Sequence, residues 1–262
     1  MESMSEEIVE QDQEYPHLAK APIVEAVIEV RGRAGVPWDE MQIKDTLQRD
    51  MKDYPEIQHI GTVDGSIRFE SGKIASFEAK DLGLQGIQFK RKDQKQIAHF
   101  NIDFFSFSRL NPYSSWDSFS TEALRLWEIH HHVLQQIEIQ RVGVRFINRI
   151  LLPTESTPIS AVFKEFPSPV PDMRVERVGF IYHDVVTLPN QPYQANIIKT
   201  IQPASAIGQG PAVILDIDAF TEEPLEPIKP NLLEALDHLR SLKNSIFFNT
   251  VTIQFIKQFR GM

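Results

Sequence analysis

Cysteine is absent from this sequence of 262 residues. Its absence excludes disulfides, thiolate metal sites and cysteine nucleophiles. The sequence also lacks any run of about 18 apolar residues, so no membrane-spanning helix is expected. Phosphate-binding loops, dinucleotide fingerprints, nucleophile elbows and metalloprotease motifs are missing as well. Enzyme classes that depend on these motifs are therefore disfavoured, and no cofactor is predicted.

Basic residues are fewer than acidic ones, with 27 Lys and Arg against 36 Asp and Glu. Six of the acids lie between Glu2 and Tyr15, a stretch without a basic residue. We expect residues 1–17 to form a disordered acidic tail, because the stretch has too little apolar surface to offset the entropy lost on ordering. The near balance of charge in the remaining chain disfavours binding to nucleic acid. The N-terminus lacks the order of a signal peptide, which favours a cytoplasmic protein.

Three short segments recur in the same order along the chain. The pairs are Val27–Arg31 with Arg141–Arg145 at an offset of 114 residues, and, at an offset of 115, His99–Phe105 with Ile214–Phe220 and Ala123–Trp127 with His238–Leu242. The recurrence predicts two tandem repeats, over residues 18–136 and 137–262, with chance similarity as the alternative.

Both repeats are predicted to follow one order of elements: strand, helix, several antiparallel strands, helix. In the first repeat the expected strands are residues 21–33, 57–63, 66–69, 87–92 and 97–107, with hairpin turns at Asp64 and Lys92. The expected helices are residues 37–54, after Pro37, and 114–134, with Ser115 as a cap.

In the second repeat we expect strands at residues 140–151, 175–186, 195–201 and 212–217. Helices are expected at residues 159–166 and 229–248, and residues 251–259 fit either a strand or a helix. The fold class is therefore α+β, with a curved sheet covered by helices on one face. This order of elements resembles the helix-grip or TATA-binding-protein type of saddle.

The segment RVGVRFINRI, residues 141–150, places an arginine at every fourth position. Because side chains alternate along a strand, Val142, Val144, Phe146 and Ile150 should face the helices, and Arg141, Arg145 and Arg149 the opposite side. By the same alternation Glu25, Glu29, Arg31 and Arg33 should share the opposite face of the first strand. Two interpretations remain open: a polar face with cross-strand ion pairs, or a surface whose arginines bind carboxylate or phosphate. The second predicts a binding module for a protein or a small anionic ligand.

An alternative function is a metal-dependent hydrolase. Asp216 and Asp218 should share a strand face, and Asp103 with His99 hold similar places in the first repeat, so these side chains could bind Mg²⁺ or act as base and orienter. Alternatively, these acidic residues are explained by the need of a half-exposed strand for polar side chains that face solvent. The run EIHHHV, in which Glu128 and His132 could share a metal, is also explained by a solvated helix face. The basic run of residues 89–96 is explained by a solvated hairpin turn.

Three segments of the chain resemble the signature blocks of a known family. They are LAKAPIVEAVIEVR (Leu18 to Arg31), RVGVRFINRI and the ending LRSLKNSIFFNTVTIQFIKQFR. The sequence is similar there to a sporadically distributed prokaryotic family of uncharacterised conserved proteins. The resemblance implies a bacterial or archaeal origin and an association with mobile elements or defence. It implies no catalytic residues.

Overall fold

The computed structural model describes residues 15–37, 40–70, 73–166, 175, 179–204 and 210–260. Side chains are described for all of these residues except 40–42 and 62–84. Most of the expected acidic tail and the prolines at 167, 169 and 171 lie outside the described residues.

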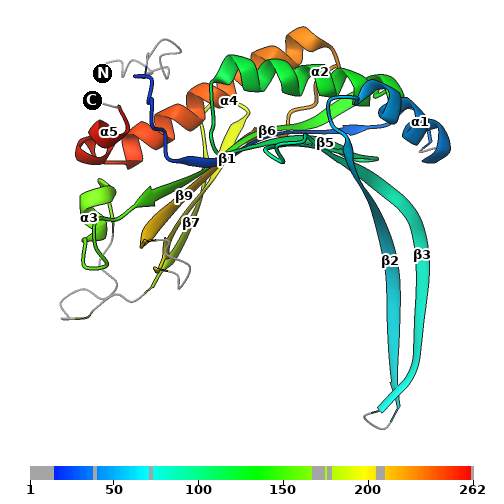
Figure 1. Cartoon of the computed structure of the whole chain (residues 1–262), viewed down its shortest axis with the longest axis horizontal. Coiled ribbons are helices and arrows are strands. Elements are labelled where there is room, and N and C mark those ends of the chain that lie inside the picture. Colours follow the sequence, from blue (N-terminus) through cyan, green and yellow to red (C-terminus); the bar gives the residue numbers. More distant parts are fainter. Residues whose placement is uncertain are drawn as a thin grey trace, which may run out of the picture. The chain divides into compact units, whose positions relative to one another are not determined.

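The fold class is α+β, as predicted (Figure 1). The strands are β1 (Ile23–Arg33), β2 (Glu56–Glu70), β3 (Lys73–Lys90), β4 (Gln96–Asn101), β5 (Phe104–Leu110), β6 (Glu138–Leu151), β7 (Ile181–Thr187), β8 (Tyr193–Gln202) and β9 (Ala212–Thr221). The helices are α1 (Glu40–Asp50), α2 (Trp116–Leu134), α3 (Ile159–Val162), α4 (Lys229–Thr250) and α5 (Ile253–Phe259). The strands follow the order β2-β3-β4-β5-β1-β6-β9-β8-β7 in a sheet.

The chain divides into two compact units. We call residues 27–142 and 222–232 the N-terminal unit, and residues 1–26, 143–221 and 233–262 the C-terminal unit. Strands β1 and β6 and helix α4 contribute residues to both. Each unit is therefore built from stretches that are not continuous in the sequence.

In the N-terminal unit, α2 packs on β5. Ser115 caps the helix as predicted, since its Oγ accepts a hydrogen bond from Ser118 N at 3.3 Å. The buried face of α2 contributes Phe119, whose ring centroid lies 5.5 Å from that of Phe107 on β5. Strands β2 and β3 are long and pair antiparallel, and Figure 1 shows the two strands side by side along their length.

In the C-terminal unit, β7, β8 and β9 are joined by antiparallel pairing. Lys243 of α4 lies over the ring of Phe146 on β6, with Nζ 3.9 Å from the ring centroid. This contact confirms that Phe146 faces the helix side of its strand. Residues 142, 144 and 150 of β6 are likewise buried, whereas Arg145 is exposed.

Several predicted boundaries are wrong. The helix expected at residues 159–166 ends at Val162, and the strand expected at residues 87–92 is the last part of β3, which begins at Lys73. The turn expected at Asp64 lies inside β2, where Asp64 pairs with Lys80 and the hairpin pairing continues to Glu70 and Lys73. The single strand expected at residues 97–107 is two strands, because Asn101 Oδ1 accepts a hydrogen bond from Asp103 N at 3.1 Å and reverses the chain. The strand expected at residues 175–186 begins only at Ile181.

The C-terminal stretch that fitted either a strand or a helix forms a helix, α5. Two of the three recurring sequence pairs fall in elements of the same type: strands β1 and β6, and helices α2 and α4. The third does not, since residues 99–105 cross the turn between β4 and β5, whereas residues 214–220 lie within β9. None of the helices in the described ranges is long and apolar enough to cross a membrane.

Candidate functional site

The best-defined ionic contact of the C-terminal unit joins Arg145 of β6 to Asp216 of β9. Arg145 Nε donates to Asp216 Oδ1 at 2.9 Å, and Nη2 donates to Oδ2 at 2.6 Å. The Asp216 side chain is 10% exposed, and that of Arg145 is 47% exposed. The hydrogen bonds with Asp216 raise the pKa of Arg145 despite the opposing effect of burial, and the charges of Asp218 and Glu25 act in the same direction. The pair therefore orients a guanidinium that remains half in solvent.

Arg149 lies four residues after Arg145 on β6. Its Nε donates to Gln202 Oε1 at 2.7 Å, and its Nη2 donates to the carbonyl oxygen of Gly210 at 2.8 Å. These contacts fix Arg149 against the end of β8 and the chain entering β9. We call Glu25, Arg145, Arg149 and Asp216 the Arg145 patch.

In the N-terminal unit, Glu29 of β1 accepts hydrogen bonds from two arginines. Arg31 Nε lies 2.8 Å and Arg141 Nη1 lies 2.7 Å from Glu29 Oε1. The Arg141 side chain is 13% exposed and that of Arg31 is 55% exposed. Arg33, further along β1, approaches Glu138 at 3.9 Å. We call Glu29, Arg31 and Arg141 the Glu29 patch.

The two patches contain all six residues predicted to bind a ligand or partner. Glu25, Arg145 and Arg149 belong to the C-terminal unit, and the other three to the N-terminal unit. Cross-strand ion pairs are present in both patches, so the first of the two interpretations drawn from the sequence describes their internal contacts. Arg31 and Arg145 still expose about half of their side chains, which leaves room for contacts from outside.

The carboxylates proposed to bind a metal are placed differently. Both oxygens of Asp216 are engaged by Arg145, and Asp218 Oδ2 accepts a 3.4 Å contact from Asn196. Asp103 is exposed in the turn between β4 and β5. Within the ranges that the structure describes, no group of three or more His, Cys, Asp or Glu side chains is arranged to hold a metal ion.

His99, predicted as a base with Asp103, is partly buried and has its ring 4.9 Å from that of Phe104. Burial lowers its pKa, so the imidazole is neutral near pH 7. Its Nε2 is buried, and no hydrogen-bond partner for it is found among the described residues. A neutral imidazole in this setting can accept a proton, but no hydrogen bond with Asp103 is recorded to orient it.

The sequence suggests that the three adjacent histidines of α2 lie on a solvated helix face. This interpretation is wrong, because the three side chains have different environments. His130 is 1% exposed, and its Nε2 donates to the carbonyl oxygen of Asn101 at 2.8 Å. His131 stacks on Trp127 with 5.2 Å between ring centroids. Only His132 is exposed. Glu128 accepts a 2.7 Å contact from Lys229. Successive residues of a helix point about 100° apart, so the triplet spreads over three environments.

A buried polar network in the N-terminal unit has no signal in the sequence. Tyr54 OH donates to Glu122 Oε1 at 2.7 Å and lies 3.1 Å from Gln96 Oε1. Arg125 donates to both oxygens of Glu122, at 2.9 and 2.7 Å. Burial, followed by the hydrogen bond with Glu122, raises the pKa of Tyr54. Burial alone would raise the pKa of Glu122, but the hydrogen bonds from Arg125 and Tyr54 outweigh it and lower the pKa.

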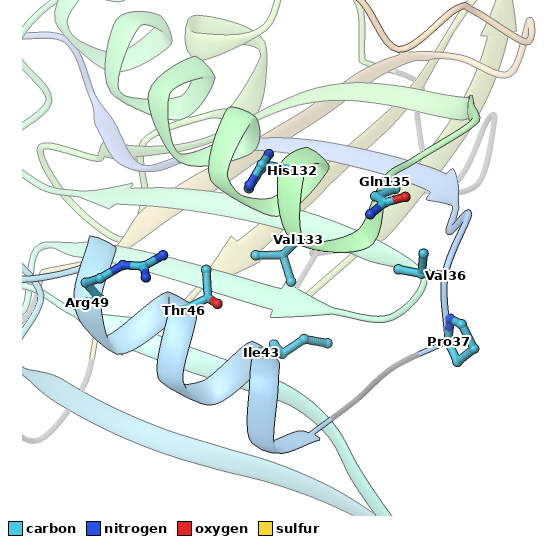
Figure 2. A pocket seen from close by; sticks show the side chains of 8 residues that line it. All are labelled: Val36, Pro37, Ile43, Thr46, Arg49, His132, Val133 and Gln135. Atoms are coloured by element: carbon cyan, nitrogen blue, oxygen red, sulfur yellow. The ribbon is translucent and has the colours of Figure 1, made fainter.

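A cavity of about 420 Å³ lies between α1 and the end of α2, inside the N-terminal unit. Figure 2 shows Thr46 and Arg49 of α1 on one side, and His132 and Val133 of α2 on the other. Its wall is completed by Val36, Pro37, Ile43 and Gln135. The volume falls within the range of small-molecule sites, and two basic side chains border it. The cavity was not predicted, because its lining comes from three separate segments.

The structure therefore supplies three features with functional potential: the Arg145 patch, the Glu29 patch and the cavity between α1 and α2. Comparison of the chain with protein-family models and with curated proteins finds no match.

Proposed function

We propose that the chain is a non-enzymatic binding module that recognises a protein partner through its ionic patches. The observation that carries the proposal is the half-exposed guanidinium of Arg145, which Asp216 holds in one orientation. A guanidinium fixed in advance loses less entropy when a partner carboxylate binds it. The resemblance to a prokaryotic family extends the proposal to a role linked to mobile elements or defence, and the N-terminal sequence, which lacks the order of a signal peptide, extends it to the cytoplasm.

The donors of Arg145 indicate how a partner would bind. Its recorded hydrogen bonds use Nε and Nη2, so Nη1 is directed elsewhere. An acidic side chain of a partner could accept from Nη1 without breaking the contact with Asp216. Arg31 of the Glu29 patch, 55% exposed, supplies a second contact of the same kind. Charge pairs at the rim of an interface affect the rate of association and its specificity more than the affinity.

The experiment is capture of a partner from the host by the tagged chain, followed by repetition with variants. Replacing Arg141, Arg145 and Arg149 with alanine would leave Asp216 without its cation and Glu29 with Arg31 alone, so the test variant also carries Glu29→Gln and Asp216→Asn. Arg109→Ala is the matched control, because Arg109 belongs to neither patch and contacts only Ser118 among its recorded side-chain hydrogen bonds. Loss of the captured partner from the test variant alone supports the proposal. Undiminished capture by a folded test variant contradicts it.

We further infer that the two halves descend from one duplicated α+β module, arranged as a saddle of the helix-grip or TATA-binding-protein type. The strand order supports this inference. The opening strand of each half lies next to the last strand of the same half, β1 beside β5 and β6 beside β9. Each half also places a helix after its opening strand and another after its last strand.

A second candidate function is binding of a small anionic ligand, and the cavity between α1 and α2 favours it. Arg49 and His132 border the cavity, and Val36, Ile43 and Val133 give it an apolar wall. Citrate and benzoate are suitable probes, because they compare a purely polar anion with one that carries an apolar ring. A rise in melting temperature with either probe, absent in the Arg49→Gln variant, would support this function. No shift with either probe at millimolar concentration would exclude it for these two classes of anion.

A further inference from the structure

Strand β7 ends the order of the sheet on one side. Among the described residues it pairs with β8 only. Three of its seven residues are large, apolar and exposed: Ile181 at 77%, Val185 at 60% and Val186 at 37%. Unpaired strand edges of this composition favour pairing with another strand, and natural proteins usually protect them with lysine, proline or a bulge. Neither lysine, proline nor a bulge occurs within Ile181–Thr187, and Asp184 is its one acidic side chain.

The backbone of β7 shows which groups are available at this edge. Leu188 N donates to Tyr193 O at 2.9 Å, so residues 188 and 193 form a hydrogen-bonded pair. Hydrogen-bonded and non-hydrogen-bonded pairs alternate along an antiparallel ladder. The N–H and C=O groups of residues 181, 183, 185 and 187 therefore point away from β8, toward the open edge. Their side chains share one face, where His183 lies opposite Ile198 and Val185 opposite Asn196.

The sequence of β7 is complementary to itself in one register. If two copies pair antiparallel about a two-fold axis at His183, Ile181 lies opposite Val185 of the second copy, and the reverse pair forms on the other side of the axis. On the opposite face, Tyr182 then lies opposite Asp184 of the second copy. Moving the axis by one residue toward the C-terminus would place Asp184 opposite its own copy, and like charges in that position are unfavourable. Moving it toward the N-terminus would place Ile181 opposite His183 and would separate it from Val185.

We propose that β7 is a homodimerisation edge, which pairs antiparallel with β7 of a second copy in a register centred on His183. The contact covers Ile181 and Val185 of both copies and satisfies the outward N–H and C=O groups. It uses backbone groups and apolar side chains, and neither ionic patch takes part. Its failure and failure of the proposed protein recognition are therefore distinguishable.

The absence of native cysteine makes the register directly measurable. In the proposed dimer, the two copies of residue 183 face each other with Cα atoms about 5.5 Å apart, a separation that a disulfide can span. The two copies of residue 187 lie eight positions apart along the strands, about 27 Å, and cannot be joined. His183→Cys is therefore the test variant, and Thr187→Cys, in the same strand and on the same face, is its matched control.

Under mild oxidation the His183→Cys protein should form a disulfide-linked dimer, and the Thr187→Cys protein should remain a monomer on a non-reducing gel. Light scattering should give the unmodified chain a mass of twice 30.1 kDa at micromolar concentration. The double variant Ile181→Lys, Val185→Lys should have half that mass. Ile253→Lys, which alters an exposed apolar residue of α5, should leave the mass unchanged. Circular dichroism confirms that each variant is folded.

Two results would overturn the proposal. One is a monomeric unmodified chain throughout the micromolar range, including the case in which β7 instead receives a strand from a different protein. The other is a dimer that survives the double lysine substitution with its secondary structure intact. Equal cross-linking of the variants at residues 183 and 187 would exclude the register.

Discussion

Arg145 donates two parallel hydrogen bonds to the carboxylate of Asp216, and the aspartate is the more buried partner. Because Asp216 lies on β9 and Arg145 on β6, the contact ties two strands together on the face that carries the Arg145 patch. The asymmetry in exposure determines what happens when one partner is removed. Loss of the arginine leaves a buried carboxylate without its cation, whereas loss of the aspartate leaves an arginine that can turn to water.

We expect Arg145→Ala to lower the free energy of unfolding by about 1–3 kcal/mol, the usual cost of leaving a buried polar group without its hydrogen-bond partner. Asp216→Asn should cost less, because Arg145 is half exposed and can be solvated. The double variant Arg145→Ala, Asp216→Asn should be more stable than Arg145→Ala alone. Urea denaturation of the four proteins gives the coupling energy directly. Additive effects of the two substitutions would show that the pair contributes nothing to stability.

The sequence predicts which side chains of β1 and β6 share a face, because apolar and ionic residues alternate along both strands with a period of two. The contacts within the patches could not be predicted from it. Which acid meets Arg141 or Arg145 depends on strand order and register, and these are set by pairing across more than 70 positions, as with Arg145 and Asp216. The prediction of a hairpin turn at Asp64 was wrong for a related reason. Asp-Gly favours a turn locally, but the register of β2 with β3 keeps it inside a strand.

His130 illustrates a similar limit. Three consecutive histidines read as a polar helix face, yet a helix that packs on a sheet turns one residue of any such triplet inward. His130 is that residue, and the hydrogen bond with the carbonyl of Asn101 compensates for its burial. The network of Tyr54 and Glu122, which are 68 positions apart, had no local pattern to reveal it.

The burial of His130 should make the stability of the protein depend on pH. Burial lowers the pKa of His130 to about 4, against the favourable effect of the Asn101 contact, with small contributions from His131 and His99. Below pH 6.5 the unfolded chain binds a proton that the native chain excludes until about pH 4. The free energy of unfolding should therefore fall as the pH decreases across this window, by up to about 3 kcal/mol from this group.

Urea denaturation between pH 4 and pH 7.5 measures this dependence. His130→Gln is the appropriate comparison, since its amide can still donate to the Asn101 carbonyl but does not titrate. The variant should show a shallower fall, with the remaining slope in part due to His99 and His131, whose pKa values burial also lowers. Identical slopes for the two proteins would mean that His130 is protonated in the folded chain near its ordinary pKa.

Gly32 of β1 should not tolerate a side chain. A Cβ atom there would lie 2.7 Å from the carbonyl oxygen of Glu138 and 2.8 Å from Nε2 of Gln136, closer than real Cβ contacts. Gly32→Ala should therefore destabilise the N-terminal unit by about 1–3 kcal/mol, the usual cost of overpacking. Gly179→Ala is the matched control, because no described atom lies within 4 Å of its Cβ position. Comparable melting temperatures for the two variants would contradict the close approach of β1 and β6 at this point.

Lys243 should be more reactive than Lys229 near neutral pH. Burial lowers its pKa to about 7, with a further contribution from the charge of Arg240. About half of the Lys243 amine is then neutral at pH 7, whereas an ordinary lysine, with a pKa near 10.4, is almost fully protonated. The residue as a whole is partly exposed, which gives a small reagent a path to the amine, although Nζ itself is shielded and donates to Asn244 Oδ1 at 2.6 Å. Limited acetylation with acetic anhydride at pH 7, followed by peptide mass spectrometry, should label Lys243 well before Lys229.

Lys229 is a suitable internal standard, because it lies on the same helix, is 49% exposed and pairs with Glu128. Labelling of Lys229 first would show that the contacts around Phe146 shield the Lys243 amine or keep it charged.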